Sequence, residues 1–360
     1  MFKTKINTSN SEIIRSLIYS LEGTFLDAEF TWDDALQVIE HNHSEREVEE
    51  YINSFLSHGV RLSDRISSVC LDSNRDVETL SGDLSHLVIG QDVQGTFLLR
   101  HEAEEVVQIL DQCIIKYFGF LSSESVHVPS LISEDNLIKA GYLPRDAHQV
   151  GALQLFDGER KRYGHVCLTP ALCLSAYPCL AQSRQDQNSR IYTSVGMVHR
   201  YENGRFSKDH SLSRMREYRV REYIGFGSPH WIDGKKEIFV EFWKRLSRVL
   251  KLPFEICTAT DIFFHGEQSR QALHQLMHAT KLELRIQLES GPLSVSSFNR
   301  HEDHFINAFG IPCTADLAGS FCVGFGLERL AQCVLLRWPD RDSRLNILNE
   351  FMSLSNKEKS

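Results

Sequence analysis

Charged side chains gather in one polar stretch near the middle of the chain, where they could bind an anion. Arg200 and Glu202 follow one apolar segment, and Arg219 and Arg221 lie in the next one after a polar loop. Side chains alternate between the two faces of a β-strand, so these four must point at water or at an opposite charge. Guanidinium groups pair well with phosphate, so a bound nucleotide would satisfy the arginines.

These side chains are predicted to lie on an antiparallel sheet. Strands are predicted over Gly164–Leu168, Ser194–Arg200, Arg216–Gly225, Phe254–Thr258, Leu282–Leu288 and Leu293–Asn299. The segments follow one another mostly as a meander and not as βαβ units. Apolar residues at i, i+3, i+4 and i+7 predict helices over His101–Phe118 and Lys235–Leu250. The predicted fold class is therefore α+β, with helices packed on an antiparallel sheet.

A glycine-rich junction toward the C-terminus is a second candidate for ligand binding. Gly324 and Gly326 follow a predicted strand, and a helix is predicted over Ala331–Leu336 with Arg329 in the first helical turn. Glycine allows a ligand to approach the backbone closely, and the start of a helix attracts anions. After the helix predicted over His101–Phe118, a short strand is predicted over Val126–Pro129, and the proline is expected to end it.

Three segments are expected along the chain. Residues 1–95 are rich in Ser, Asp, Glu and His, and the short amphipathic stretches Ser11–Leu21 and Trp32–Ile39 predict a small, mostly helical N-terminal appendage. Residues 96–345 are predicted to form the catalytic domain, and residues 346–360 a polar tail. Residues 1–95 contain no sustained heptad pattern, so a long coiled-coil arm is not expected.

Composition narrows the classes of function. A net charge of -9 argues against a protein that holds nucleic acid through its phosphate backbone, because that requires a clustered positive surface. No signal peptide is recognisable, and no apolar run reaches the ~20 residues of a membrane span, so the expected location is the cytoplasm. Nine scattered cysteines fit a reduced compartment, where most are expected to be small buried apolar residues.

The motifs together resemble those of class II aminoacyl-tRNA synthetases. Arg200-x-Glu202 with its returning strand is similar to the second signature motif, Gly324-x-Gly326-x-x-Arg329 to the third, and Pro129 after the long helix to the proline of the first. Five further segments resemble seryl-tRNA synthetase relatives that lack a tRNA-binding arm, the amino acid:[carrier protein] ligases: Val128–Ile132, Leu168–Cys173, Arg214–Glu222, Ser296–Asn299 and Cys322–Gly326. The resemblance implies the catalytic fold of class II synthetases and a homodimer.

The same resemblance implies roles for single residues. It assigns Arg200 to the α-phosphate and carboxylate region of the adenylation site, and Glu202 to the adenine amine. Tyr218 is expected to stack on the base, and Arg329 to contact the γ-phosphate of ATP. Mg²⁺ is expected to bridge the phosphates. Leu293 stands near the expected place of its carboxylate ligand and Glu289 is the closest acid, so the Mg²⁺ ligands are left open. A second group of matching positions is expected to line the amino-acid pocket: Asp261, Lys281 and Asn299.

In the resembling ligases a zinc ion binds the amino group of the substrate, and the positions matching its ligands are Cys173, Glu222 and Cys322. Three protein ligands with one open position are typical of a functional zinc site, whereas a structural site has four. Two alternatives remain from the residues themselves. Cys167 or Cys179 could replace Cys173 as the ligand, and Glu222 could instead pair with a neighbouring arginine of its own strand.

The function implied is activation of a small amino acid as its adenylate, followed by transfer to the phosphopantetheine thiol of a carrier protein. Glycine, alanine and serine are the candidate substrates. Charging of tRNA and a non-catalytic, synthetase-like binding module are the alternatives, although the acidic chain without an arm argues against tRNA. The chain departs from the pattern at His199, where an aromatic residue usually stands, and at Leu174 and Ser175, where an aromatic residue and a histidine are expected.

Overall fold

The computed structural model describes residues 2–6, 17–18, 21, 30–33, 38–53, 69–74, 76–93, 95–143, 149–157, 160–182, 189–201, 212–259, 280–313 and 319–354. The chain divides into two compact units. One unit comprises residues 1–69 and 259–279, and the other comprises residues 70–258 and 280–360. None of the helices in the described part of the chain has both the length and the apolar character needed to span a bilayer.

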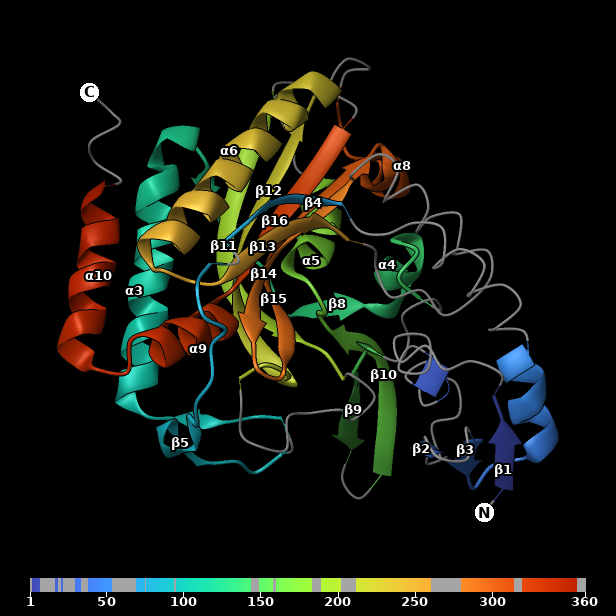
Figure 1. The fold of residues 1–360 in the computed structure, drawn as a ribbon. Helices are drawn as coiled ribbons and strands as arrows, with labels where there is room; N and C mark the ends of the chain where they lie inside the picture. The colour runs from blue at the N-terminus through green and yellow to red at the C-terminus, as the bar shows by residue number, and fades with distance from the viewer. Residues whose placement is uncertain are drawn as a thin grey trace. The chain divides into compact units, whose positions relative to one another are not determined.

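An eight-stranded sheet forms the centre of the larger unit (Figure 1). Its strands, in spatial order, are β4 (Cys70–Ser73), β13 (Phe254–Thr258), β14 (Lys281–Leu288), β15 (Gly291–Glu302), β16 (Gly319–Gly326), β12 (Glu217–Gly227), β11 (Arg190–His199) and β7 (Glu124–Ser125). All neighbouring pairs are antiparallel except β7 with β11. The predicted antiparallel sheet is confirmed, and five of the six predicted strands fall in it.

One face of this sheet is covered by aromatic packing. Helix α6 (Pro229–Val249) places Phe239 and Phe242 against Phe321 and Phe325 of β16, with ring centroids 6.1 and 5.6 Å apart. Helix α3 (His101–Tyr117) lies beside α9 (Leu327–Arg337) and α10 (Arg341–Leu354) (Figure 1). All four rings are fully buried, and each contributes about 1.5–3 kcal/mol through burial. The helices predicted from apolar periodicity are confirmed in α3 and α6.

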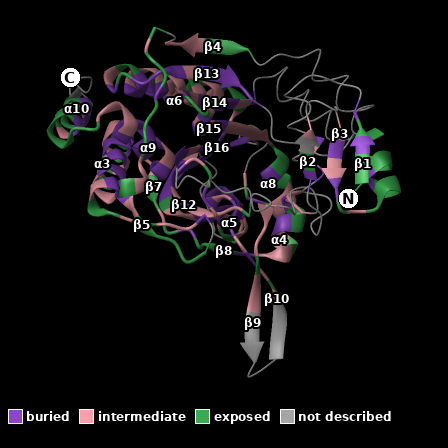
Figure 2. Cartoon of the chain, turned by 60° about the horizontal axis from the view of Figure 1, so that its bottom comes forward, coloured by how far each residue is buried: buried purple, intermediate pink, exposed green. Residues whose placement is uncertain are grey.

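The opposite face carries shorter elements. Helices α5 (Leu172–Leu180) and α8 (His304–Phe309) contact the sheet there, and α4 (Glu134–Lys139) contacts α5. A three-stranded sheet of order β8-β10-β9 follows, with β8 (Leu131–Ser133), β9 (Ala152–Asp157) and β10 (Arg160–Leu168), so the predicted strand Gly164–Leu168 lies outside the large sheet. Nearly all residues of β12 and β16 are buried between the two layers (Figure 2).

Short elements connect the N-terminal part of this unit. They are the 3-10 helices η1 (Ser85–Leu87) and η2 (Phe118–Leu121) and the strands β5 (Val88–Gly90) and β6 (Leu98–Leu99). The strand predicted over Val126–Pro129 is not formed, because the ladder with β11 covers only β7. Strand β4 pairs with β13 in the large sheet, so the main unit begins before the predicted boundary at residue 96.

The C-terminal segment differs from the predicted polar tail. Helix α10 continues to Leu354, and its Leu348 and Phe351 are fully buried. Arg344 donates a hydrogen bond of 2.6 Å to the Trp338 carbonyl and forms an ion pair with Glu102 of α3. Apolar burial and the ion pair of the buried Arg344 fix residues 346–354 to the main unit, and residues 355–360 lie outside the described part of the chain.

The smaller unit contains strands where helices were predicted. Strands β1 (Phe2–Lys5), β2 (Phe30–Asp33) and β3 (Val38–His41) form a sheet of order β1-β3-β2, and a helix covers 45–53. The stretch Trp32–Ile39 therefore contributes to two strands and not to a helix. Burial alternates along β3, with Ile39 and His41 toward the core, which is the period of a strand.

Candidate metal and nucleotide site

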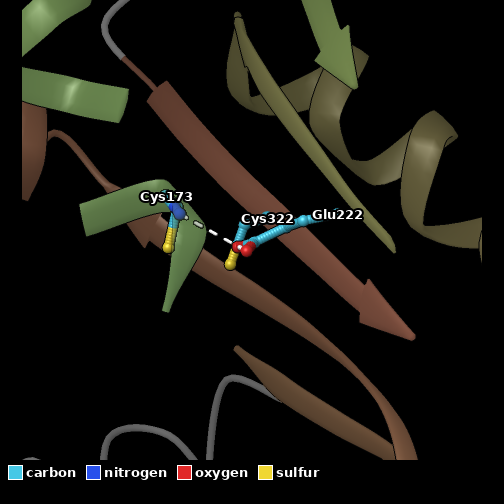
Figure 3. Close-up of side chains that lie close together, drawn as sticks. All are labelled: Cys173, Glu222 and Cys322. Atoms are coloured by element: carbon cyan, nitrogen blue, oxygen red, sulfur yellow. Dashed lines mark hydrogen bonds between the residues drawn. The ribbon is translucent and has the colours of Figure 1, made fainter. Parts of the chain in front are cut away.

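Three elements bring the predicted metal ligands together. Cys173 lies in the first turn of α5, Glu222 in the middle of β12, and Cys322 in the adjacent strand β16. Glu222 is opposite Gly324, and Cys322 is two residues before that glycine. Residues two positions apart on a strand share a face, so the carboxylate and the Cys322 thiol lie on the same side of the sheet, beneath α5 (Figure 3).

The ligand atoms of Cys173, Glu222 and Cys322 all lie within 4.8 Å of one another. Each residue is at most 5% exposed. Glu222 Oε2 accepts hydrogen bonds from the backbone N–H groups of Leu172, at 3.1 Å, and Cys173, at 3.3 Å. The carboxylate thus holds the N-terminus of α5, where the helix dipole favours negative charge. Among the described residues no other group of three metal-ligating side chains is as close.

The competing cysteines lie elsewhere. Cys179 is exposed, and Cys167 is on β10; neither joins the group of ligand atoms. The exposed thiol of Cys179 lies six residues after Cys173 in the same helix, so sequence proximity alone could not distinguish the two. The geometry favours Cys173.

The two arginines of β12 do not face a nucleotide, and that prediction is wrong for them. Arg219 donates hydrogen bonds to Glu104 of α3 and to Glu328 of α9, both at 2.7 Å. Arg221 forms a paired interaction with Asp111 of α3 at 2.6 and 2.7 Å. Because side chains alternate along β12, these arginines point to the face opposite Glu222. The alternative in which Glu222 pairs with one of them is therefore excluded.

Burial gives the three-residue group unusual acid–base properties. The hydrogen bond with Cys322 and burial raise the pKa of Cys173 well above its usual value. At Cys322 the bond with Cys173 lowers the pKa, but burial and the nearby Glu222 outweigh it, so the pKa is raised. Burial also raises the pKa of Glu222, although bonds from both cysteines and from the α5 backbone partly offset the change. Together these groups resist losing protons unless a cation is present.

A second cluster lies around Tyr218, on the same face of β12. The guanidinium carbons of Arg200 and Arg329 lie 5.9 and 5.3 Å from the centroid of its ring. Arg200 Nε donates to the Pro170 carbonyl at 3.3 Å, and Arg329 Nη1 donates to the Ser294 carbonyl at 3.2 Å. Arg329 Nε is buried and has no hydrogen-bond partner among the described residues. The cluster offers guanidinium groups suited to phosphate.

The remaining predicted residues are placed only in part. Glu202 and Asp261 lie outside the described residues, as does the His-rich stretch from His265 to His278. Lys281 and Asn299 are opposite each other on β14 and β15. Asn299 Nδ2 lies 3.6 Å from Cys322 Sγ and donates to Ser297 Oγ at 3.2 Å. Lys281 Nζ forms an ion pair with Glu283 Oε1 at 3.7 Å.

Two residues beside the candidate metal ligands were missed in the sequence. His301 Nε2 lies 3.7 Å from Cys322 Sγ, and His301 Nδ1 lies 3.1 Å from the Tyr177 hydroxyl. Their spacing carries a signal, because His301 is two residues after Asn299 on a strand and Tyr177 is four after Cys173 on a helix. Both spacings place side chains on a shared face.

Comparison with known proteins supports the resemblance. No protein-family model matches the chain. The chain is 26% identical over 246 residues to amino acid--[acyl-carrier-protein] ligase 1 of Bradyrhizobium diazoefficiens, covering 60% of this chain and 74% of the relative. It is also 26% identical over 171 residues to the type-2 serine--tRNA ligase of Methanococcus maripaludis, covering 45% of this chain and 33% of that relative.

Among solved structures, the M. kandleri seryl-tRNA synthetase in complex with A. aeolicus tRNASec is similar, with a TM-score of 0.65 and 16% identity. The match covers 97% of this chain and 77% of that chain. The predicted catalytic fold of class II aminoacyl-tRNA synthetases is therefore confirmed. The resemblance to amino acid:[carrier protein] ligases and seryl-tRNA synthetases is confirmed as well, and with it the predicted enzyme class, a ligase.

Proposed function

We propose that this protein uses ATP to activate a small amino acid as its aminoacyl-adenylate and transfers it to the phosphopantetheine thiol of a carrier protein. The observation that carries the proposal is the buried group of Cys173, Glu222 and Cys322, on the same face of β12 as the cluster of Arg200, Tyr218 and Arg329. A site for an amino group next to a site for phosphates is what adenylation requires. The relatives named as carrier-protein ligases support the choice of acceptor.

The donor set of the first site fits zinc. Two thiolates and one carboxylate are common zinc ligands, and three protein ligands are the usual number in sites that bind substrate. Burial and their mutual contacts raise the pKa values of Cys173, Glu222 and Cys322, and a bound cation would offset this by stabilising the deprotonated side chains. A bound zinc ion would offer its open position to the free amino group of the substrate, which selects amino acids over hydroxy acids.

The second site supplies positive charge for the nucleotide. Arg200 and Arg329 would contact the α- and γ-phosphates as the substrate carboxylate attacks the α-phosphorus, where negative charge develops. The unpartnered Nε of Arg329 supports a role in binding an anion. Tyr218 is 5% exposed, with both guanidinium groups near its ring, so stacking on adenine requires one of them to move. Mg²⁺ would accompany ATP.

Transfer to the carrier needs no side-chain nucleophile. The phosphopantetheine sulfur forms a bond to the carbonyl carbon of the adenylate, the bond from that carbon to the AMP oxygen breaks, and the thiol proton passes to solvent. Because a mixed anhydride is reactive, holding the thiol near the carbonyl is sufficient.

Glycine, alanine and serine are the proposed substrates, and a homodimer in the cytoplasm is the proposed state.

The proposal is tested in two steps. Exchange of pyrophosphate into ATP, measured for each amino acid, should identify a small substrate. Loading of a phosphopantetheine-bearing carrier should then follow, detected as a mass increase of the carrier. Loading of tRNA in place of the carrier would refute the acceptor, and exchange with no amino acid at all would favour a non-catalytic binding module.

Metal analysis tests the amino-group site independently. Purified protein should contain about one zinc per chain, and Cys173→Ala and Cys322→Ala should lose it. Cys179→Ala is the matched control, because that thiol is exposed in the same helix as Cys173 and outside the group of ligand atoms. Equal zinc content in all three variants would contradict the assignment.

A further inference from the structure

An imidazole connects the two elements that carry the thiols. His301 lies near the end of β15, with Nε2 at 3.7 Å from Cys322 Sγ on β16. Its other nitrogen, Nδ1, lies 3.1 Å from the Tyr177 hydroxyl on α5 and 3.5 Å from Ser320 Oγ. Tyr177 is completely buried one helical turn after Cys173. The Tyr177 hydroxyl, the imidazole and the Cys322 sulfur therefore form a continuous row beside the proposed metal ligands.

His301 is a neighbour of the proposed metal ligands and not one of them. The set of ligand atoms that all lie within 4.8 Å of one another contains Cys173, Glu222 and Cys322 but not His301. A fourth protein ligand would also close the position that the amino group needs. Contact of the imidazole with the Cys322 sulfur is instead the arrangement of a residue that acts through a ligand.

With a metal bound to Cys322, the contacts would decide which nitrogen of His301 carries the proton. A thiolate that binds a metal can only accept hydrogen bonds, so the nitrogen facing Cys322, Nε2, must be the donor. In a neutral imidazole the other nitrogen then accepts. Tyr177 meets this requirement, because a phenol is protonated at neutral pH and can donate its O–H to Nδ1. Asn299 adds a second N–H near the same sulfur, at 3.6 Å.

We propose that His301 is a positioning residue that donates its Nε2–H to the Cys322 thiolate, and that Tyr177 fixes the required tautomer. The proposal rests on the proposed metal site. Hydrogen bonds to a thiolate withdraw electron density from the sulfur, so the metal attracts the substrate amino group more strongly. They also hold the Cys322 side chain in the orientation that its neighbours Cys173 and Glu222 require.

Three variants separate this role from general packing. His301→Phe removes both ring nitrogens and keeps an aromatic ring beside Phe305, whose centroid is 4.7 Å away. His301→Gln retains an N–H donor. Tyr177→Phe removes only the hydroxyl, so it tests the tautomer with little change in shape. His304→Gln is the matched control, because the described contact of the His304 ring is with the Ala140 carbonyl at the C-terminal end of α4 and not with any of the three ligands.

The measurements are zinc affinity, by competition with a chromophoric chelator, and the sulfur-to-cobalt absorption band after replacement by Co²⁺. His301→Phe should weaken zinc binding by about 10- to 100-fold and shift the band. Tyr177→Phe should change both in the same direction by a smaller factor, His301→Gln should restore part of the affinity, and His304→Gln should resemble the parent. In pyrophosphate exchange, KM for the amino acid should rise more than kcat falls.

The outcomes distinguish this inference from the proposed function. If the parent protein binds zinc and activates an amino acid while His301→Phe keeps the parent affinity and absorption band, the role of His301 is refuted and the proposed function stands. If the parent binds no zinc, the metal site and the role of His301 are refuted, while pyrophosphate exchange and carrier loading still decide the proposed function. A Tyr177→Phe variant identical to the parent refutes the assigned tautomer even if His301→Phe does not fold.

Discussion

Zinc binding should depend steeply on pH, with a slope that counts the thiols. Cys173 and Cys322 are buried with raised pKa values, so both thiols are protonated in the metal-free protein at neutral pH. Each must release its proton when zinc binds. One proton per pH unit corresponds to about 1.4 kcal/mol, so two thiols give about 2.7 kcal/mol, or roughly 100-fold in Kd per pH unit. Affinity should increase as the pH rises.

The assay is competition with a chelator of known proton affinity at several values between about pH 6.5 and 8. Any residual zinc binding by Cys322→Ala should follow half of that slope on a logarithmic scale, about 10-fold per pH unit, because one thiol remains. Glu222 has a raised pKa as well and can only add to the slope at the acidic end. A slope of one proton or less in the parent protein would refute a site built from two thiols.

The stability of the metal-free protein should decrease as the pH rises, whereas its affinity for zinc should increase. The folded pKa values of Cys173 and Cys322 are raised above the value of about 8.5 for a thiol in an unfolded chain. Their contribution to stability is therefore complete below that pH and decreases as the pH rises above it. Urea denaturation of the apoprotein from about pH 7 to 10 measures the change, and an increase in stability over this range would contradict it.

Four further variants are predicted. Asp111→Asn leaves the buried Arg221 without a counter-charge and should lower the free energy of unfolding by about 3–5 kcal/mol in urea denaturation. Glu105→Gln is the control on the same helix. Its partner Arg341 is 54% exposed, so the loss should be less than about 1 kcal/mol. Gly225→Ala should destabilise the sheet measurably, because its Cβ would lie 2.1 Å from the Phe321 ring; an unchanged denaturation midpoint would contradict this. Arg329→Ala should reduce pyrophosphate exchange by about 100- to 1,000-fold without unfolding the protein.

Regular patterns made most of the main fold predictable. The apolar stripe of α3 and the alternating residues of β12 gave the correct element types, because both patterns reflect a single buried face. The end of the chain was misjudged because α10 looks polar, although Leu348 and Phe351 are spaced three apart and both are buried. The stretch Trp32–Ile39 was misjudged because a short apolar pattern fits a strand as well as a helix.

The candidate site could be predicted only through resemblance. Cys173, Glu222 and Cys322 are separated by 49 and 100 residues, and no local spacing indicates that their side chains meet. Pairing between β12 and β16, and the position of α5, bring them together. The partners of Arg219 were equally unpredictable. Alternation along β12 places Arg219 and Glu222 on opposite faces, but only the packing of the helices shows that Arg219 pairs with carboxylates.

Strand β12 keeps its two tasks on separate faces. Tyr218 and Glu222 lie on the face of the proposed site, while Arg219 and Arg221 on the other face hold helices α3 and α9. The ion pairs of Arg219 and Arg221 do not depend on the residues of the site face, although Glu222 on that face also holds the N-terminus of α5. Arginines preserved at positions 219 and 221 in a distant homologue therefore indicate a preserved fold, and not preserved activity.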